Sequence, residues 1–110
     1  GLGVENLSKN QAVIDLIKEY FDKKKYVIAI CAAPVVLELA GIIKNKTVTS
    51  YPSVKEKLKS IKNYSEDKVV IDNKIITSRG FGTAIDLGLR LIELFSGKVE
   101  MEKIKKAIVY

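Results

Sequence analysis

The sequence predicts an α/β fold built on parallel strands, because strand-like and helix-like runs alternate along the chain. The strongest strand signal is the continuous apolar run Tyr26–Ile30, which is typical of a strand covered on both faces. Stretches with a helical apolar face precede and follow this run. The chain has 110 residues, which fits one small domain with a single core.

The N-terminal part is predicted to be a turn followed by a helix. Gly1-Leu2-Gly3 indicates the turn, and Ser8 and Gln11 have the spacing of a capping box at a helix start. Lys23-Lys24-Lys25 ends the helix with positive charge, which suits the negative end of the helix dipole. The expected apolar face of this helix consists of Val13, Ile17, Tyr20 and Phe21, with Ile14 beside it.

After the Tyr26–Ile30 strand, the middle of the chain is predicted to contain only short elements. Pro34 suits the first turn of a helix, and Gly41 suits a left-handed cap at its end. The elements expected in this part are a helix over Val35–Ala40, a strand over Thr47–Thr49 that is a candidate neighbour of the first strand, a turn at Tyr51-Pro52 and a short helix over Val54–Leu58.

The C-terminal part begins with a predicted hairpin, in which Val69–Ile71 and Lys74–Thr77 flank a turn at Asp72-Asn73. A glycine-containing loop, Ser78–Gly82, leads into the strongest helix, which starts at Thr83, has Asp86 in its first turn and ends at Ser96-Gly97. A last helix covers Glu100–Ala107 and carries Met101 and Ile104. The residues of the strongest helix expected to face inward are Ala84, Leu87, Gly88, Leu91 and Phe95.

The predicted sheet lacks neighbours for its most buried strand. A strand covered on both faces normally has partners on both edges, and this chain offers too few. We therefore expect Gly1 to be an internal position of a longer protein. We also expect this chain to pack against the N-terminal segment of the same protein. On this interpretation the chain does not fold alone.

Composition excludes several classes of protein and site. There is no transmembrane run or signal peptide, and a single cysteine excludes an internal disulfide framework and favours a reducing, cytoplasmic location. The absence of histidine excludes a catalytic triad or a histidine-based metal site within this chain. The net charge of +6 permits a nucleic-acid surface, but the lysines are dispersed among acids without interleaved aromatics, which favours a solvated surface.

Cys31 is the principal candidate for a functional residue. It directly follows the predicted strand and precedes a helix that begins near Pro34. A sharp strand-to-helix turn exposes such a side chain above a helix N-terminus, where the helix dipole favours a thiolate. The alternative is a small, buried, inert apolar residue, which is the usual role of a lone cysteine.

Five segments, taken together, resemble the ThiJ/PfpI superfamily, in the branch of the Parkinson's-associated deglycase. The resemblance covers residues 1–110 and implies the C-terminal portion of a single domain, with a flavodoxin-like sandwich in which helices flank a mostly parallel sheet. The segments are Gly3–Leu7, Ala29–Pro34, Val48–Pro52, Tyr64–Glu66 and Thr77–Thr83.

The resemblance implies a reactive Cys31 at a nucleophile elbow, with the backbone amide of Ala32 in the anion-stabilising position. The acidic partner of the cysteine lies upstream of Gly1, and a glycine pair near the pocket falls at or just before Gly1. Family members with a pocket histidine carry it where this chain has Tyr51. Tyr51 is therefore expected to donate a hydrogen bond to a substrate oxygen, to cap the pocket, or to serve only as a turn residue.

The loop before Thr83 gives two further pocket candidates, Gly80 and Gly82, because in the family this loop approaches the elbow. The alternative explanation of these glycines is a tight turn that needs positive φ. Asp86 is better explained as a helix-start residue than as a catalytic acid.

Two functions use the same residues. The first is a glyoxalase or deglycase-like enzyme in which the Cys31 thiolate adds to a small aldehyde such as methylglyoxal, with no metal and no cofactor. The second is a non-catalytic oxidative-stress sensor or chaperone in which Cys31 oxidises to the sulfinic acid. We expect a homodimer, with no nucleic acid and no membrane as partner. A cysteine peptidase or glutamine amidotransferase is disfavoured, because both need a histidine.

Overall fold

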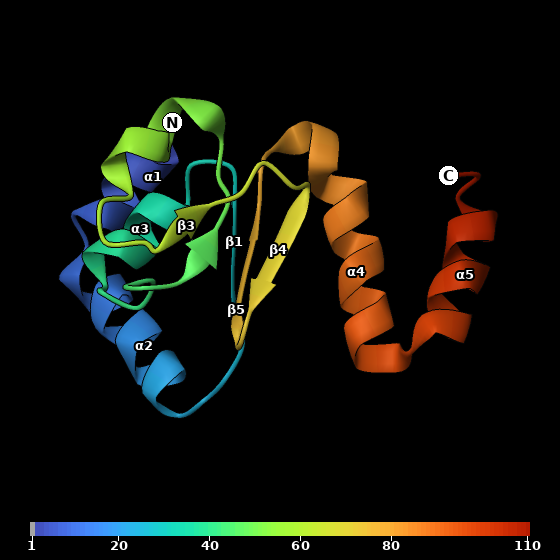
Figure 1. The fold of residues 1–110 in the computed structure, drawn as a ribbon. Coiled ribbons are helices and arrows are strands. Elements are labelled where there is room, and N and C mark those ends of the chain that lie inside the picture. The colour runs from blue at the N-terminus through green and yellow to red at the C-terminus, as the bar shows by residue number, and fades with distance from the viewer. Residues whose placement is uncertain (1) are drawn as a thin grey trace.

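The computed structural model describes residues 2–110 and has the predicted α/β arrangement. Figure 1 shows α1, α2 and α3 on one side of the central sheet and α4 and α5 on the other. The elements are α1 Leu2–Ser8, α2 Gln11–Asp22, β1 Val27–Ile30, α3 Pro34–Leu39, β2 Thr47–Val48, η1 Pro52–Lys57, β3 Asn63–Tyr64, β4 Val69–Asp72, β5 Ile75–Ser78, η2 Phe81–Thr83, α4 Ala84–Ser96 and α5 Lys98–Ala107, where η marks a 3₁₀ helix.

The central sheet has the strand order β1-β5-β4, so the second strand of the hairpin lies in the middle. β5 is parallel to β1, with Ile30 opposite Ser78, and antiparallel to β4. The hairpin is thus confirmed, and its turn residue Asn73 has a φ of 54°, which asparagine tolerates better than most residues. Because β1 and β5 are parallel, their C-terminal ends lie at the same end of the sheet, where Cys31 follows β1.

β2 does not pair with β1, so the expectation that Thr47–Thr49 neighbours the first strand is wrong. β2 instead forms a separate parallel pair with β3, a two-residue strand that the sequence pattern did not reveal. The physical reason is a side-chain contact: the amide of Thr47 donates to Asp72 Oδ2 over 2.8 Å, and the amide of Thr49 donates to Thr77 Oγ1 over 2.9 Å. These bonds anchor the small sheet to the hairpin.

β1 is an edge strand in this chain, and it is not covered on both faces as predicted. Ala29 is buried, but Ile28 is 43% exposed. Alternate residues of a parallel strand bond to the same neighbour. The amides of Val27 and Cys31 donate to β5 or its flanking residues, so the peptide groups of Ile28 point to the open edge.

The N-terminal region differs from the prediction in two ways. Leu2–Ser8 is a helix rather than a turn, while Gly1 lies outside the described residues. The cap of α2 is Asn10 rather than Ser8, since Asn10 Oδ1 accepts from the amides of Ala12 and Val13. An asparagine one residue before the helix supplies the acceptor that the capping-box spacing assigned to Ser8.

The core lies between the helices α2 and α3 and the strands beside them. Ile43, Val48 and Ile75 are almost completely buried there, together with Ile14 and Leu37. Burying each aliphatic side chain of this kind contributes about 1.5–3 kcal/mol. Gly41 has a φ of 74° at the end of α3, which confirms the predicted left-handed cap. This core fixes α3 against the sheet and hence the turn that precedes it.

On the other side of the sheet, α4 begins after Thr83 as predicted, with Asp86 in its first turn. Its inward face is centred on Leu89, whereas the predicted inward residues Ala84 and Phe95 are exposed. The ring of Phe95 meets the ring of Tyr26 edge to face at 5.0 Å, which explains why a surface position is aromatic. α5 packs on α4 through Met101, and none of the described helices has the length and apolarity needed to cross a membrane.

Candidate active site at the Cys31 elbow

Cys31 sits on a sharp turn between β1 and α3, as the sequence predicts. Its φ is 64°, in the left-handed region that non-glycine residues rarely adopt. Such a conformation costs about 1–3 kcal/mol and persists only where the surroundings enforce it. The side chain is partly exposed, so the prediction of an accessible thiol at a strand-to-helix elbow agrees with the geometry.

Two hydrogen bonds hold the backbone of Cys31 from opposite sides. Its amide donates to the carbonyl of Ser78 over 3.0 Å, and its carbonyl accepts from the amide of Tyr51 over 2.7 Å. The first bond extends the β1–β5 pairing by one residue. The second joins the elbow to the chain segment that follows β2. Together these bonds enforce the left-handed conformation.

Ala32 is buried and directly follows Cys31 in the chain. Its backbone amide differs from those of its two neighbours in its hydrogen bonding. The amide of Cys31 donates to Ser78 and that of Ala33 donates to the carbonyl of Ile30. Among the described residues, no carbonyl or side chain accepts from the amide of Ala32. An amide next to the sulfur that bonds to no other group is available to an anion formed there.

Tyr51 and Gly80 lie together at this end of the sheet. A Cβ on Gly80 would lie 3.6 Å from Cδ2 of Tyr51, so the tyrosine ring covers the glycine. Tyr51 is 49% exposed. Since the amide of Tyr51 is bonded to Cys31, the structure brings three of the predicted site residues together: Cys31, Tyr51 and Gly80.

Gly82 does not join this group, because it is exposed and a Cβ there would have nothing within 4 Å. The turn explanation of both glycines is also wrong. Gly80 has a φ of 170°, which is extended backbone, and Gly82 does not have the positive φ that would require glycine. A Cβ on Gly80 would make only an ordinary van der Waals contact with the Tyr51 ring, so among the described residues neither backbone conformation nor space requires glycine at these two positions.

Ser50, Tyr64 and Arg79 form a polar network behind the elbow that the sequence reasoning did not single out as functional. The hydroxyl of Tyr64 donates to the Ser50 carbonyl over 3.0 Å, and Nη2 of Arg79 donates to the same hydroxyl over 3.3 Å. Nε of Arg79 also donates to the Ser50 carbonyl, over 3.3 Å. All three stand in family-like segments, and Arg79 also belongs to the loop expected to approach the elbow, which are the sequence signals for them.

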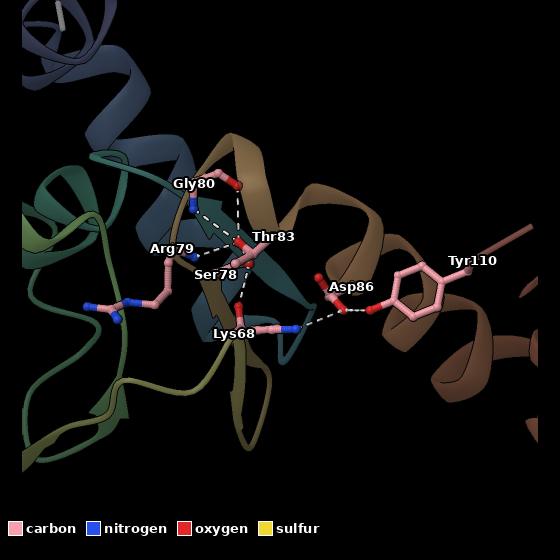
Figure 2. A network of polar contacts seen from close by, with 7 residues as sticks. All are labelled: Lys68, Ser78, Arg79, Gly80, Thr83, Asp86 and Tyr110. Carbon is pink, nitrogen blue, oxygen red and sulfur yellow. Dashed lines mark hydrogen bonds and ion pairs between the residues drawn. The ribbon is translucent and has the colours of Figure 1, made fainter. Parts of the chain in front are cut away.

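This network changes the acidity of Tyr64. Burial alone raises the pKa of the phenol, but hydrogen bonds with Ser50 and Arg79 and the positive charge of Arg79 outweigh burial. The pKa of Tyr64 is therefore lowered from its usual value. Where the start of α4 meets the segment after α5, the pKa of the exposed Tyr110 is raised because its hydroxyl donates to the Asp86 carboxylate, an arrangement visible in Figure 2.

Asp86 has partners of its own away from the elbow. Its carboxylate accepts from Tyr110 and lies 4.0 Å from Nζ of Lys68 (Figure 2). These contacts agree with the prediction of a helix-start residue. Nowhere in residues 2–110 do three or more potential metal-ligating side chains gather. The predicted upstream acid and glycine pair fall at or before Gly1, outside the described residues.

A surface groove of about 250 Å³ runs beside the elbow, between α1, α3 and η1. Ala32 is one of its lining residues, and its walls combine apolar and charged side chains. The groove is lined by Val4, Glu5, Ser8, Lys9, Ala32, Val35, Leu39, Val54 and Lys57. A small molecule can therefore approach the residue that follows Cys31 from this side.

A cysteine on a strand-to-helix elbow of an α/β sheet defines a class of nucleophile-elbow proteins. The comparisons identify the family within that class: the chain belongs to the DJ-1/PfpI family, whose model matches residues 1–94. It is 38% identical to protein dj-1beta of Drosophila melanogaster over 99% of the chain. It is 34% identical to the glutathione-independent glyoxalase DJ-1 of Schizosaccharomyces pombe over 98% of the chain.

The fold comparison agrees with the family. The crystal structure of Drosophila melanogaster DJ-1beta covers 97% of this chain with a TM-score of 0.90 and 34% sequence identity. The predicted resemblance and the flavodoxin-like α/β fold are thereby confirmed. The chain spans 59% of the Drosophila relative, 57% of the Schizosaccharomyces relative and 58% of the chain in the crystal structure.

Raising the pH should ionise Tyr64 before Tyr110, because the pKa of Tyr64 is lowered and that of Tyr110 is raised. The stabilising effect of ionised Tyr64 is fully present above its unfolded pKa of about 10 and is lost as the pH falls through the lower folded value. The effect of Tyr110 has the opposite sign: it is present below about pH 10 and is lost as the pH rises through the raised folded pKa.

Ultraviolet titration of phenolate absorbance in the intact protein tests this order. Tyr64→Phe should remove the most acidic part of the curve, and Tyr110→Phe the most alkaline part. Arg79→Gln should move the Tyr64 transition to higher pH, since it removes both a donor and a positive charge. Loss of the most alkaline part in Tyr64→Phe would contradict the assignment.

Proposed function

We propose that the intact protein is a cysteine-dependent glyoxalase or deglycase-like enzyme that consumes small reactive aldehydes such as methylglyoxal. The observation that carries the proposal is the left-handed backbone of Cys31, held between β5 and the segment after β2. A strained, doubly anchored elbow is a costly arrangement for a residue that only fills space. The similarity to a glutathione-independent glyoxalase supports the same activity.

The reaction needs no external oxidant or reductant. The Cys31 thiolate adds to the aldehyde carbon, and the former carbonyl oxygen takes a proton to give a hemithioacetal. The hydrogen on that carbon then moves as a proton to the neighbouring ketone carbon, and the hydroxyl proton moves to the ketone oxygen, so one carbon is oxidised as the other is reduced. The product is a thioester, and water releases the hydroxy acid and the free thiol.

Two groups at the elbow would assist the addition. The Ala32 amide would donate to the oxyanion that develops when sulfur attacks the carbonyl, since it bonds to no other group of the described chain. The Tyr51 hydroxyl would donate a second hydrogen bond or close the pocket over the substrate. The tyrosine is half exposed next to Gly80, which leaves its hydroxyl free to turn toward a bound molecule.

A second function, oxidation sensing, is favoured by a different observation. Cys31 is partly exposed and is the only cysteine of the chain, so its sulfenic acid has no resolving thiol here. It would therefore advance to the sulfinic acid, which the Ala32 amide would stabilise. The same lone free thiol supports our proposal of a reducing, cytoplasmic location.

For partners, we propose a further strand of the same protein on the open edge of β1. The peptide groups of Ile28 point to that edge, and Ile28 is 43% exposed. An apolar edge strand of this kind is normally paired or covered. The relatives and the solved structure are longer than this chain and would accommodate such a segment. A homodimer of the intact protein stays a prediction.

Cys31→Ser should abolish methylglyoxal consumption by the intact protein, because a hydroxyl is a far weaker nucleophile than a thiolate. Tyr51→Phe should reduce turnover by about ten- to a hundredfold if its hydroxyl binds the oxyanion. The matched control is Tyr20→Phe, the same change at an exposed position on α2, and it should leave turnover unchanged. Unchanged turnover in Cys31→Ser would refute the enzymatic proposal.

Mild peroxide should convert Cys31 to the sulfinic acid before it oxidises Met101. Cys31 is partly exposed, whereas Met101 is only 9% exposed between α4 and α5. Peptide mass spectrometry across a peroxide series measures both residues in the same sample, and unfolding in urea provides the reference in which burial no longer protects. A native protein that oxidises at Met101 while Cys31 stays reduced would exclude both functions.

The chain Gly1–Tyr110, expressed alone, should unfold without a cooperative transition, because the open edge of β1 leaves an apolar strand half paired. Circular dichroism and thermal unfolding of this fragment and of the intact protein make the comparison. A soluble monomer of the fragment with a sharp transition would show that no further strand is needed.

A further inference from the structure

Thr83 stands at the start of α4, but its hydroxyl does not cap that helix. A threonine at this position usually accepts a hydrogen bond from an amide two or three residues into the helix. Here the hydroxyl turns back to the loop between β5 and α4. Figure 2 shows it at the centre of a set of hydrogen bonds with Ser78, Arg79 and Gly80.

The hydroxyl of Thr83 is fully used by this loop. It accepts from the amides of Arg79 over 3.2 Å and Gly80 over 3.1 Å. Its single hydrogen is shared between the Gly80 carbonyl at 3.0 Å and the hydroxyl of Ser78 at 2.8 Å. The Ser78 hydroxyl in turn donates to the carbonyl of Lys68 over 2.6 Å, so its own hydrogen is committed.

Each group that Thr83 holds also contacts the elbow or its neighbours. The carbonyl of Ser78 accepts from the amide of Cys31, and Gly80 lies against the ring of Tyr51. The side chain of Arg79 reaches the carbonyl of Ser50, directly before the amide that bonds to the carbonyl of Cys31. Thr83 is thus linked to both peptide groups that flank Cys31, through Ser78 on one side and Arg79 on the other.

We propose that Thr83 is a positioning residue whose hydroxyl fixes the Arg79–Gly80 segment against the Cys31 elbow and thereby sets the reactivity of the thiol. This inference rests on the proposed role of Cys31 as a nucleophile. Thr83 touches neither the thiol nor a substrate; it acts through Ser78, Arg79 and Gly80. Removal of its hydroxyl leaves the buried amide of Gly80 without an acceptor and frees the loop to move.

The test is the rate at which iodoacetamide alkylates Cys31 in the intact protein at neutral pH. Thr83→Val, which keeps the shape and removes the hydroxyl, should slow alkylation about tenfold while the protein stays folded by circular dichroism. Thr83→Ser retains the hydroxyl and should restore the wild-type rate. Thr47→Val makes the same chemical change at a half-buried position on β2, outside this network, and should also react at the wild-type rate.

A folded Thr83→Val protein with the wild-type rate overturns the inference, as does a Thr83→Ser protein that is as slow as Thr83→Val or a Thr47→Val protein that slows equally. The proposed function fails separately, if Cys31 of the folded wild type reacts no faster than Cys31 in urea.

Amide hydrogen exchange of the wild type decides the inference if Thr83→Val does not fold or if the thiol proves unreactive. The amides of Gly80 and Cys31 should then exchange through the same local unfolding event, because the hydrogen bonds of Thr83 hold both Gly80 and the Ser78 residue that binds Cys31. Independent openings of these two amides would overturn the inference.

Discussion

The left-handed backbone at Cys31 is the constraint on which the site depends. An L-residue adopts this conformation only where its surroundings supply enough favourable contacts. Here one contact is the amide of Cys31 donating to Ser78, and the other is the amide of Tyr51 donating to the carbonyl of Cys31. Both partners belong to segments that lie 20 or more residues away along the chain. The elbow therefore exists only when β1, β5 and the segment after β2 are assembled, and its chemistry is a property of the folded sheet.

Behind the elbow, polar contacts join the segments that contain Ser50, Tyr64 and Arg79. Arg79 binds the Ser50 carbonyl and the Tyr64 hydroxyl, and its guanidinium lies near the Tyr64 ring, which Lys55 also approaches at 5.0 Å. Two of the cations of this chain, whose net charge is +6, thus make cation–π contacts with the Tyr64 ring. Burial raises the pKa of Tyr64, but the hydrogen bonds with Ser50 and Arg79 and the charge of Arg79 outweigh burial and lower it. Through the Ser50 carbonyl, this network holds the segment whose next amide, that of Tyr51, bonds to the carbonyl of Cys31.

The errors of the sequence interpretation share a physical cause. Patterns of apolar residues predicted which elements exist, but not what lies on each side of them. Tyr26–Ile30 carries the pattern of a doubly covered strand, yet in this chain one edge is open and Ile28 is half exposed. Thr47–Val48 has the pattern of a strand, but it pairs with β3, and the amides of Thr47 and Thr49 bond to side chains of the hairpin rather than to β1. In α4, Phe95 remains exposed although the sequence pattern predicts that it faces inward, and its ring contacts that of Tyr26.

The sequence by itself determined the α/β class, the hairpin at Asp72-Asn73, the elbow at Cys31 and the resemblance that the DJ-1/PfpI family match confirms. These follow from local rules: proline at a helix start, glycine or asparagine at positive φ, and an apolar run that ends at a cysteine. Only the tertiary structure decided that Gly80 lies beneath Tyr51 while Gly82 lies apart, and that Thr83 binds the loop instead of capping its helix. The reason is that hydrogen bonds between distant segments depend on the register and direction of the strands that carry them, and residue spacing along the chain does not encode these.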